Sequence, residues 1–234
     1  MKNRLLFLML LLLLCTCTHR NDVVIKGHIE EGYGRTIYLS LVTTDGIRML
    51  DSASLSRGFF SFVIKDEQLS LTVPEGNPAF YQLALSDDNA MTTVAQAGQT
   101  IEIKANAKSL VKTYHVSGSA DALLMWQLDS ALACFVSATD TLLWVYETNM
   151  DNDSIRADVE KRYNALADNH TLYLRQFVKE NAQSMSAIIA FYQVYNNRKF
   201  LDEKTDADVF SLLVDALTKK YPTNEYISYL QARR

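Results

Sequence analysis

The chain has 234 residues, of which 48% are hydrophobic and 21% charged, a balance typical of a globular protein and not of a disordered one. With 8 glycines and 3 prolines, it is neither collagen-like nor a low-complexity linker. The formal net charge is −4, so the sequence lacks the basic surface of a nucleic-acid-binding protein, and no nucleic-acid partner is predicted.

The N-terminus has the pattern of a secretory signal peptide. Lys2 and Arg4 form a short positive region, and an unbroken run of Leu, Phe and Met occupies residues 5–14. That run is too short to cross a bilayer as a helix, which takes about 20 apolar residues. A buried core helix is the alternative, at the extreme end of the chain. We expect residues 1–16 to be a leader that is removed from the mature protein.

The segment that follows indicates a lipid anchor. Cys15-Thr16-Cys17 resembles the lipobox of bacterial lipoproteins, in which a diacylglyceryl group is attached to the sulfur of the Cys after the cleavage site. Cys17 fits better than Cys15, because Leu14 stands three residues before it and the fairly small Thr16 directly before it. An ordinary secreted protein with two incidental cysteines is the alternative. We therefore predict lipidation at Cys17, an anchor and linker over residues 17–22, and a protein bound to a bacterial envelope membrane, facing the periplasm or the cell surface.

Residues 23–118 alternate short apolar runs with Gly, Asn and Asp turn signals. Asp45-Gly46 and Arg57-Gly58 are typical of tight turns between strands. Short strands at regular spacing favour an antiparallel β-sandwich over βαβ units. The predicted strands are 23–29, 35–42, 47–55, 59–64, 79–85, 90–96, 100–105 and 114–117.

From residue 119 onward the apolar spacing becomes helical, which predicts an α-helical bundle segment over 119–234 and an α+β fold overall. A first helix carries Leu124, Leu128 and Phe135, and a second begins after Asp153 as its N-cap. The second helix has an apolar stripe of Ile155, Val159, Tyr163, Leu166, His170, Tyr173 and Phe177. Shorter helices are predicted over 185–195, 206–219 and 224–234, the first two capped by Ser184 and Thr205.

Several short segments, taken in their order, resemble a known arrangement. They are Ile25-Lys26-Gly27-His28-Ile29, Gly58-Phe59-Phe60-Ser61-Phe62, Gly98-Gln99-Thr100-Ile101-Glu102-Ile103, Phe177-Val178-Lys179-Glu180-Asn181 and Tyr221-Pro222. Similar segments occur ahead of the thioredoxin-like thiol–disulfide oxidoreductase domain of bacterial envelope lipoproteins, where a β-domain of unknown function precedes a helical segment. The resemblance implies an architecture and a compartment. This sequence has no Cys-x-x-Cys motif, which carries that family's chemistry, so the resemblance transfers no catalytic residue.

The side chains that carry chemistry in other proteins have simpler interpretations here. Cys134 lies among apolar residues without a basic neighbour, which favours a buried structural cysteine. His170 lies on the apolar stripe and is expected to be half-buried and hydrogen-bonded, not a ligand. Asn149, Asp151 and Asp153 imitate the spacing of a calcium loop, but a turn and a helix cap explain them. We predict no catalytic residue, no metal site and no cofactor.

The sequence favours a non-catalytic binding or interaction module of the cell envelope, with an unknown small-molecule ligand or an envelope protein as its partner. One alternative is the docking half of a thiol–disulfide oxidoreductase system that acts with a separate thioredoxin-like domain. Another is a carbohydrate-binding β-sandwich, since exposed Tyr and Trp stack on sugar rings. A row of aromatic side chains on one sheet face would favour the carbohydrate alternative.

Overall fold

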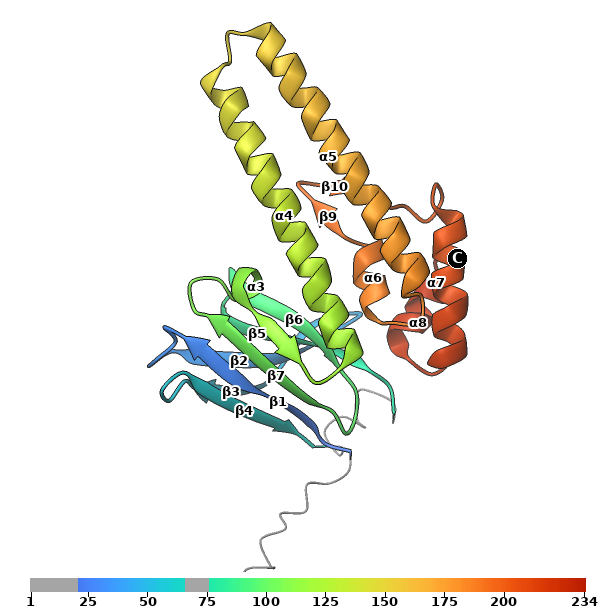
Figure 1. The fold of residues 1–234 in the computed structure, drawn as a ribbon. Coiled ribbons are helices and arrows are strands. Elements are labelled where there is room, and N and C mark those ends of the chain that lie inside the picture. The colour runs from blue at the N-terminus through green and yellow to red at the C-terminus, as the bar shows by residue number, and fades with distance from the viewer. Residues whose placement is uncertain (1–20, 66–75) are drawn as a thin grey trace, which may run out of the picture.

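The computed structural model describes residues 21–65 and 76–234, which form a β-sandwich followed by a helical part (Figure 1). The α+β fold class is therefore confirmed. The predicted leader at residues 1–16 and the predicted lipidation site Cys17 lie outside the described residues.

The first sheet has the strand order β4-β1-β7-β8, with β4 at Phe59–Ile64, β1 at Val23–Glu30, β7 at Thr100–Asn106 and β8 at His115–Ser117. Strands β1 and β4 are antiparallel, whereas β1 and β7 are parallel, from Val24 opposite Thr100 to Glu30 opposite Asn106. The prediction of a purely antiparallel sandwich is wrong at this one pair. Between β1 and β7 the chain forms β4 and the four strands of the second sheet. No hairpin therefore joins β1 to β7 and forces them to be antiparallel.

The second sheet is antiparallel throughout, in the order β3-β2-β5-β6. Its strands are β3 (Gly46–Ser54), β2 (Thr36–Thr43), β5 (Ala79–Ser86) and β6 (Asn89–Ala95). Alternate side chains of both sheets fill the space between them, and the fully buried ones include Ile25, Ile101, Leu39 and Tyr81. This alternation is the period of two that the sequence displays.

The predicted strands agree with the observed ones to within one residue at either end. The Arg57-Gly58 turn is confirmed as well, with φ values of 54° and 82° that place both residues in the left-handed region of tight hairpin turns. The sequence does not predict α3 (Leu110–Thr113), a single helical turn between β7 and β8.

The helical part begins with a long antiparallel hairpin that rises away from the sandwich (Figure 1). It consists of α4 (Ala120–Thr148) and α5 (Asp153–Glu180). The shorter elements gather beside the lower half of α5: α6 (Ser186–Phe191), β9 (Val194–Tyr195), β10 (Arg198–Lys199), α7 (Ala207–Lys220) and α8 (Glu225–Gln231).

Details of these helices differ from the prediction. The N-cap of α5 is Asn152, whose side chain accepts a hydrogen bond from the Ile155 amide at 3.2 Å, so Asp153 is already helical. The N-cap of α7 is Asp206, not Thr205. The third predicted helix stops at Phe191, and the chain then forms the β9–β10 hairpin. Its turn residues Asn196 and Asn197 have φ values of 46° and 63°, which asparagine tolerates better than most residues.

The helical part packs on the outer face of the second sheet. Phe80 of β5 and Val94 of β6 belong to the helical core and not to the core between the sheets. The ring of Tyr226 in α8 meets Phe80 edge-on at 5.1 Å, and its hydroxyl donates to the carbonyl of Val42. The Asn224 side-chain amide donates to the carbonyl of Pro78 at 3.0 Å. These contacts join the two parts through one shared layer.

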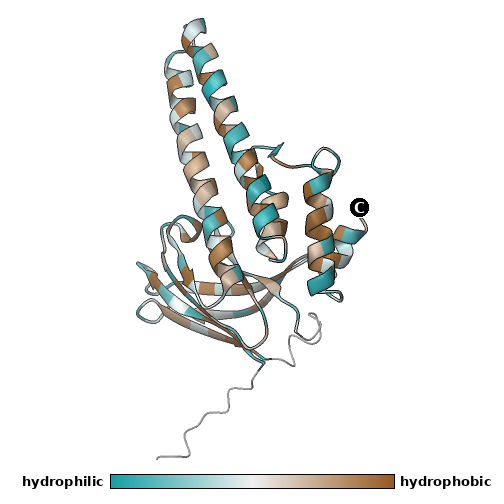
Figure 2. Ribbon diagram, turned by 45° about the vertical axis from the view of Figure 1, so that its right-hand side comes forward, coloured by the Kyte–Doolittle hydropathy of each residue, from teal (hydrophilic) through white to brown (hydrophobic). Residues whose placement is uncertain are grey.

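Helix α4 is apolar in composition although part of its surface is exposed to solvent. Figure 2 shows it mostly brown and white, whereas α5 beside it alternates with teal. Of the helices in the described ranges, α4 alone has the length and composition of a membrane-crossing helix, properties that core helices share. Its Phe135 and Leu142 are buried in the helical part, while Trp144 is 65% exposed. The distal half of α4 therefore presents apolar surface that the described chain leaves uncovered.

Candidate binding site

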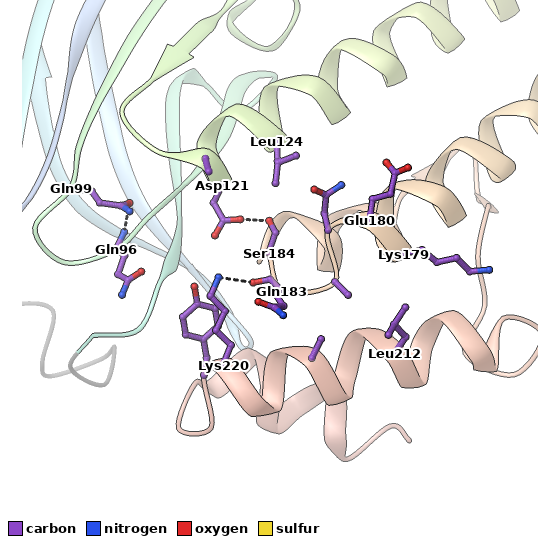
Figure 3. A pocket seen from close by; sticks show the side chains of 15 residues that line it. Gln96, Gln99, Asp121, Leu124, Lys179, Glu180, Gln183, Ser184, Leu212 and Lys220 are labelled. Carbon is purple, nitrogen blue, oxygen red and sulfur yellow. Dashed lines mark hydrogen bonds between the residues drawn. The ribbon is translucent and has the colours of Figure 1, made fainter.

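A cavity lies where the sandwich meets the helices, and we call it the junction cavity (Figure 3). Its volume is about 570 Å³. The turn between β6 and β7, the N-terminus of α4, the C-terminal end of α5 and one face of α7 line it. The lining side chains include Gln96, Gln99, Asp121, Ser184, Leu212 and Lys220.

Local structure holds each wall in place. The side chain of Gln99 accepts a hydrogen bond from the Gln96 amide at 3.0 Å, which closes the β6–β7 turn. Ser119 caps α4 by accepting from the Ala122 amide at 3.0 Å, so Asp121 stands in the first helical turn. Gly118, just before the cap, has a φ of +110°, and a Cβ atom there would lie 1.9 Å from the Thr100 carbonyl oxygen. Only glycine allows α4 to begin so close to β7.

Hydrogen bonds of Ser184 and Ser186 link α4 to the turn before α6. Ser184 donates to the carboxylate of Asp121, and the Ser186 hydroxyl donates to the Asp121 carbonyl at 2.8 Å. The Ser184 oxygen in turn accepts from the Ser186 amide at 3.1 Å. The Ser184 hydroxyl is thus used both as donor and as acceptor, and its partners are a carboxylate and a backbone amide. These partners hold the turn in place, whereas an activated serine has a histidine or lysine base as its partner.

The cavity offers groups of both charges together with neutral amides. Lys220 donates from Nζ to the carbonyl of Gln183 at 3.0 Å and lies 4.9 Å from the ring centroid of Tyr221. Lys179 and Glu180 of α5 stand across from it, and Leu212 provides an apolar wall (Figure 3). Such a lining suits a small ligand with several hydrogen-bonding groups and no strong net charge.

A partly buried carboxylate lies at the contact between the sandwich and α4. Tyr114 precedes β8 and donates from its hydroxyl to Asp129 of α4 at 2.7 Å. Burial raises the pKa of Asp129 to about 6, although the Tyr114 hydrogen bond acts in the opposite direction. Burial and the nearby carboxylate both raise the pKa of Tyr114. The folded structure therefore favours the protonated form of Asp129 more than water does.

The side chains singled out from the sequence lie away from the junction cavity. His170 is 7% exposed, and its Nε2 donates to the Gln193 side-chain oxygen at 2.6 Å. Its ring lies 4.8 Å from that of Phe135 and 4.7 Å from that of Phe200, and burial lowers its pKa. The expectation of a hydrogen-bonded core histidine is confirmed, although the ring is more deeply buried than expected.

The interpretation of Cys134 is wrong, because its side chain is exposed. Phe135, the next residue, is buried, and neighbours along a helix point about 100° apart, so apolar sequence neighbours do not place a side chain in the core. Within residues 21–65 and 76–234, no group of three or more His, Cys, Asp or Glu side chains is placed to hold a metal ion.

The outer face of the first sheet bears on the carbohydrate alternative. His28 and Phe59 lie side by side at its β4 edge, with ring centroids 4.6 Å apart. At the opposite edge His115 lies 5.6 Å from Trp126 of α4. The ion pair of Lys26 with Glu102, at 2.8 Å, belongs to the strands between the two pairs. The face carries two separate aromatic pairs with charges between them.

Comparisons of the sequence with models of protein families and with curated proteins find no match.

Proposed function

We propose that this protein is a non-catalytic binding module of the bacterial cell envelope, tethered to a membrane by a lipid on Cys17. The leader pattern at residues 1–16 and the Cys15-Thr16-Cys17 segment support the tether. The junction cavity supports the binding role and is the observation that carries the proposal. It is formed where the sandwich and the helices meet, a usual place for ligand sites between two parts of a protein.

The binding role is tested by thermal melts of the purified chain with three probes: the dipeptide Ala-Ala, maltose and free amino acids. We expect one class to raise the melting temperature, because a ligand that binds only the folded state stabilises it. The rise should disappear in Lys220→Ala and persist in Lys219→Ala, the exposed neighbour outside the cavity lining. A rise with maltose that survives Lys220→Ala would favour the carbohydrate alternative instead. No rise with any probe at millimolar concentration contradicts the proposal.

The tether is tested by metabolic labelling with a fatty-acid probe followed by membrane fractionation. Wild type and Cys15→Ala should carry the label and remain in the membrane fraction. Cys17→Ala should lose the label and be released or left unprocessed, since the acyl chains hold the protein on the bilayer. Label lost only in Cys15→Ala would move the site to that residue, and unlabelled wild type would refute the tether.

The exposed thiol of Cys134 favours a second candidate function, the docking half of a thiol–disulfide oxidoreductase system. Its thiolate would attack a disulfide of a thioredoxin-like partner, forming a mixed disulfide and releasing one partner thiolate. A thioredoxin with one active-site cysteine, carrying a thionitrobenzoate leaving group, measures this step by colour. If the two proteins dock, Cys134 should release thionitrobenzoate from this thioredoxin faster than an equal concentration of glutathione does, and Cys134→Ser should release none. A release rate equal to that of glutathione contradicts docking.

A further inference from the structure

A second cleft lies on one flank of the α4–α5 hairpin, with a volume of about 420 Å³, and none of its lining residues lines the junction cavity. We call it the tyrosine cleft, after Tyr146 of α4, Tyr163 of α5 and Tyr195 of β9, which line it. Leu142 and Val159, both buried, form its apolar base. Three phenol rings from three separate elements therefore surround one apolar floor.

The β9–β10 hairpin holds the third wall. The Tyr195 ring meets Phe135 edge-on at 5.3 Å, and the Thr139 hydroxyl lies 3.2 Å from the Tyr195 hydroxyl. Asn196, at the left-handed turn of the hairpin, also lines the cleft. The hairpin itself is attached to α5 through the His170–Gln193 hydrogen bond. The cleft is thus supported from the buried core and does not depend on a ligand for its shape.

The charges that line the cleft have one sign. Its ionisable groups, apart from the phenols, are the carboxylates of Asp140 and Glu160, and it has no basic lining residue. Among residues 21–65 and 76–234, neither carboxylate takes part in an ion pair. Two carboxylates without an ion-pair partner, beside phenol rings, favour a cation over an apolar surface.

One ring of the cleft already accepts a cation. The guanidinium of Arg156 lies 5.6 Å from the ring centroid of Tyr146 and pairs with Asp153 at 3.2 Å. Arg156 is not a lining residue of the cleft, but its charge opposes the binding of a second cation nearby. Removing the charge of Arg156 should therefore strengthen the binding of a cation in the cleft.

We propose that the tyrosine cleft binds a small organic cation, an ammonium group that carries apolar substituents. The phenol rings attract the cation through their negative faces, and the two carboxylates add a direct charge interaction. Leu142, Leu143 and Val159 contact the apolar substituents. An anion is disfavoured by the two carboxylates, and a neutral molecule of the same shape gains only the apolar contact.

The test compares choline with 3,3-dimethylbutan-1-ol, a neutral molecule of the same shape in which carbon replaces the quaternary nitrogen. Binding to the purified full chain is measured by titration calorimetry at low salt. We expect choline to bind about tenfold more tightly than the alcohol, since a cation–π contact contributes about 0.5–2 kcal/mol. Equal affinities, or no heat from choline at tens of millimolar, overturn the proposal.

Variants locate the site. Glu160→Gln keeps the shape of an exposed side chain and should weaken choline binding about fivefold without changing the affinity for the alcohol. Asp158→Asn is the control, because Asp158 is an exposed carboxylate of α5 that lies outside the cleft lining and pairs with Arg162 at 3.7 Å, and it should leave binding unchanged. Arg156→Gln should tighten binding at least twofold. Weakening by Asp158→Asn equal to that by Glu160→Gln, or weaker binding in Arg156→Gln, overturns the assignment.

Discussion

Replacing Asp129 by Asn should stabilise the protein at neutral pH. The carboxylate is held at the contact between the sandwich and α4, and it accepts the Tyr114 hydroxyl at 2.7 Å. Asparagine keeps an oxygen that accepts the same hydrogen bond but carries no charge. The substitution therefore removes the cost of burying a charge and preserves the contact.

The magnitude follows from the pKa of Asp129, which burial raises from its ordinary 3.8 to about 6. Between these values the folded state holds a proton that the unfolded chain has released, so the free energy of unfolding falls as the pH rises from about 4 to about 6. At 1.36 kcal/mol per pKa unit, the difference corresponds to about 3 kcal/mol above pH 6. Asp129 is partly accessible to solvent, which reduces the expected gain to about 1–2 kcal/mol.

Urea unfolding followed by circular dichroism from pH 4 to pH 8 measures this gain. Asp129→Asn should exceed wild type by about 1–2 kcal/mol at pH 7 and equal it near pH 4. As a control, Tyr114→Phe removes the donor to the carboxylate, so it should lose more stability at pH 7 than at pH 4. A difference between Asp129→Asn and wild type that does not change with pH, or a less stable variant at pH 7, refutes the reasoning.

Three further predictions concern stability and are measured by the same unfolding assay. His170→Leu leaves the buried Gln193 oxygen without its donor and should cost about 1–3 kcal/mol at pH 7. Because burial lowers the pKa of His170, the stability of wild type relative to His170→Leu should fall as the pH drops below about 6.5, whereas the Asp129 contribution is common to both proteins. Leu174→Ala, at a fully buried position, should cost about 2–5 kcal/mol, and more than Leu166→Ala at a partly exposed one. Gly118→Ala should cost more than about 1 kcal/mol, because its Cβ would clash with the β7 backbone. Neutral effects would contradict each.

The strands were predictable because two local signals agree along residues 23–118. Alternating side chains mark each strand, and turn residues such as Arg57-Gly58 mark where it ends. Which strands pair with one another is harder to predict from the sequence. The parallel pairing of β1 with β7 joins segments far apart in the sequence, and no hairpin links them, so nothing local specifies its direction.

The helices show the same division. A sustained apolar stripe predicts α5 because Val159, His170 and Phe177 repeat over many turns. The six-residue α6 and the β9–β10 hairpin are too short to display a period, and Asn196-Asn197 is the local sign of the turn between β9 and β10. The exposure of Cys134 depends on which face of α4 meets α5, which its sequence neighbours do not reveal.

By itself, the sequence determined the strands, the two long helices and the change of period near residue 119, and it supplies the whole argument for a leader and for Cys17 as the anchor. Only the tertiary structure decided which strands pair and which residues share a cavity. Gln99, Asp121 and Lys220 line the junction cavity from three separate elements, and the tyrosine cleft likewise joins residues of α4, α5 and β9. The physical reason is the sequence separation over which each kind of interaction acts. Periodicity and turn chemistry act between residues a few positions apart, whereas a cavity depends on how distant segments pack against one another.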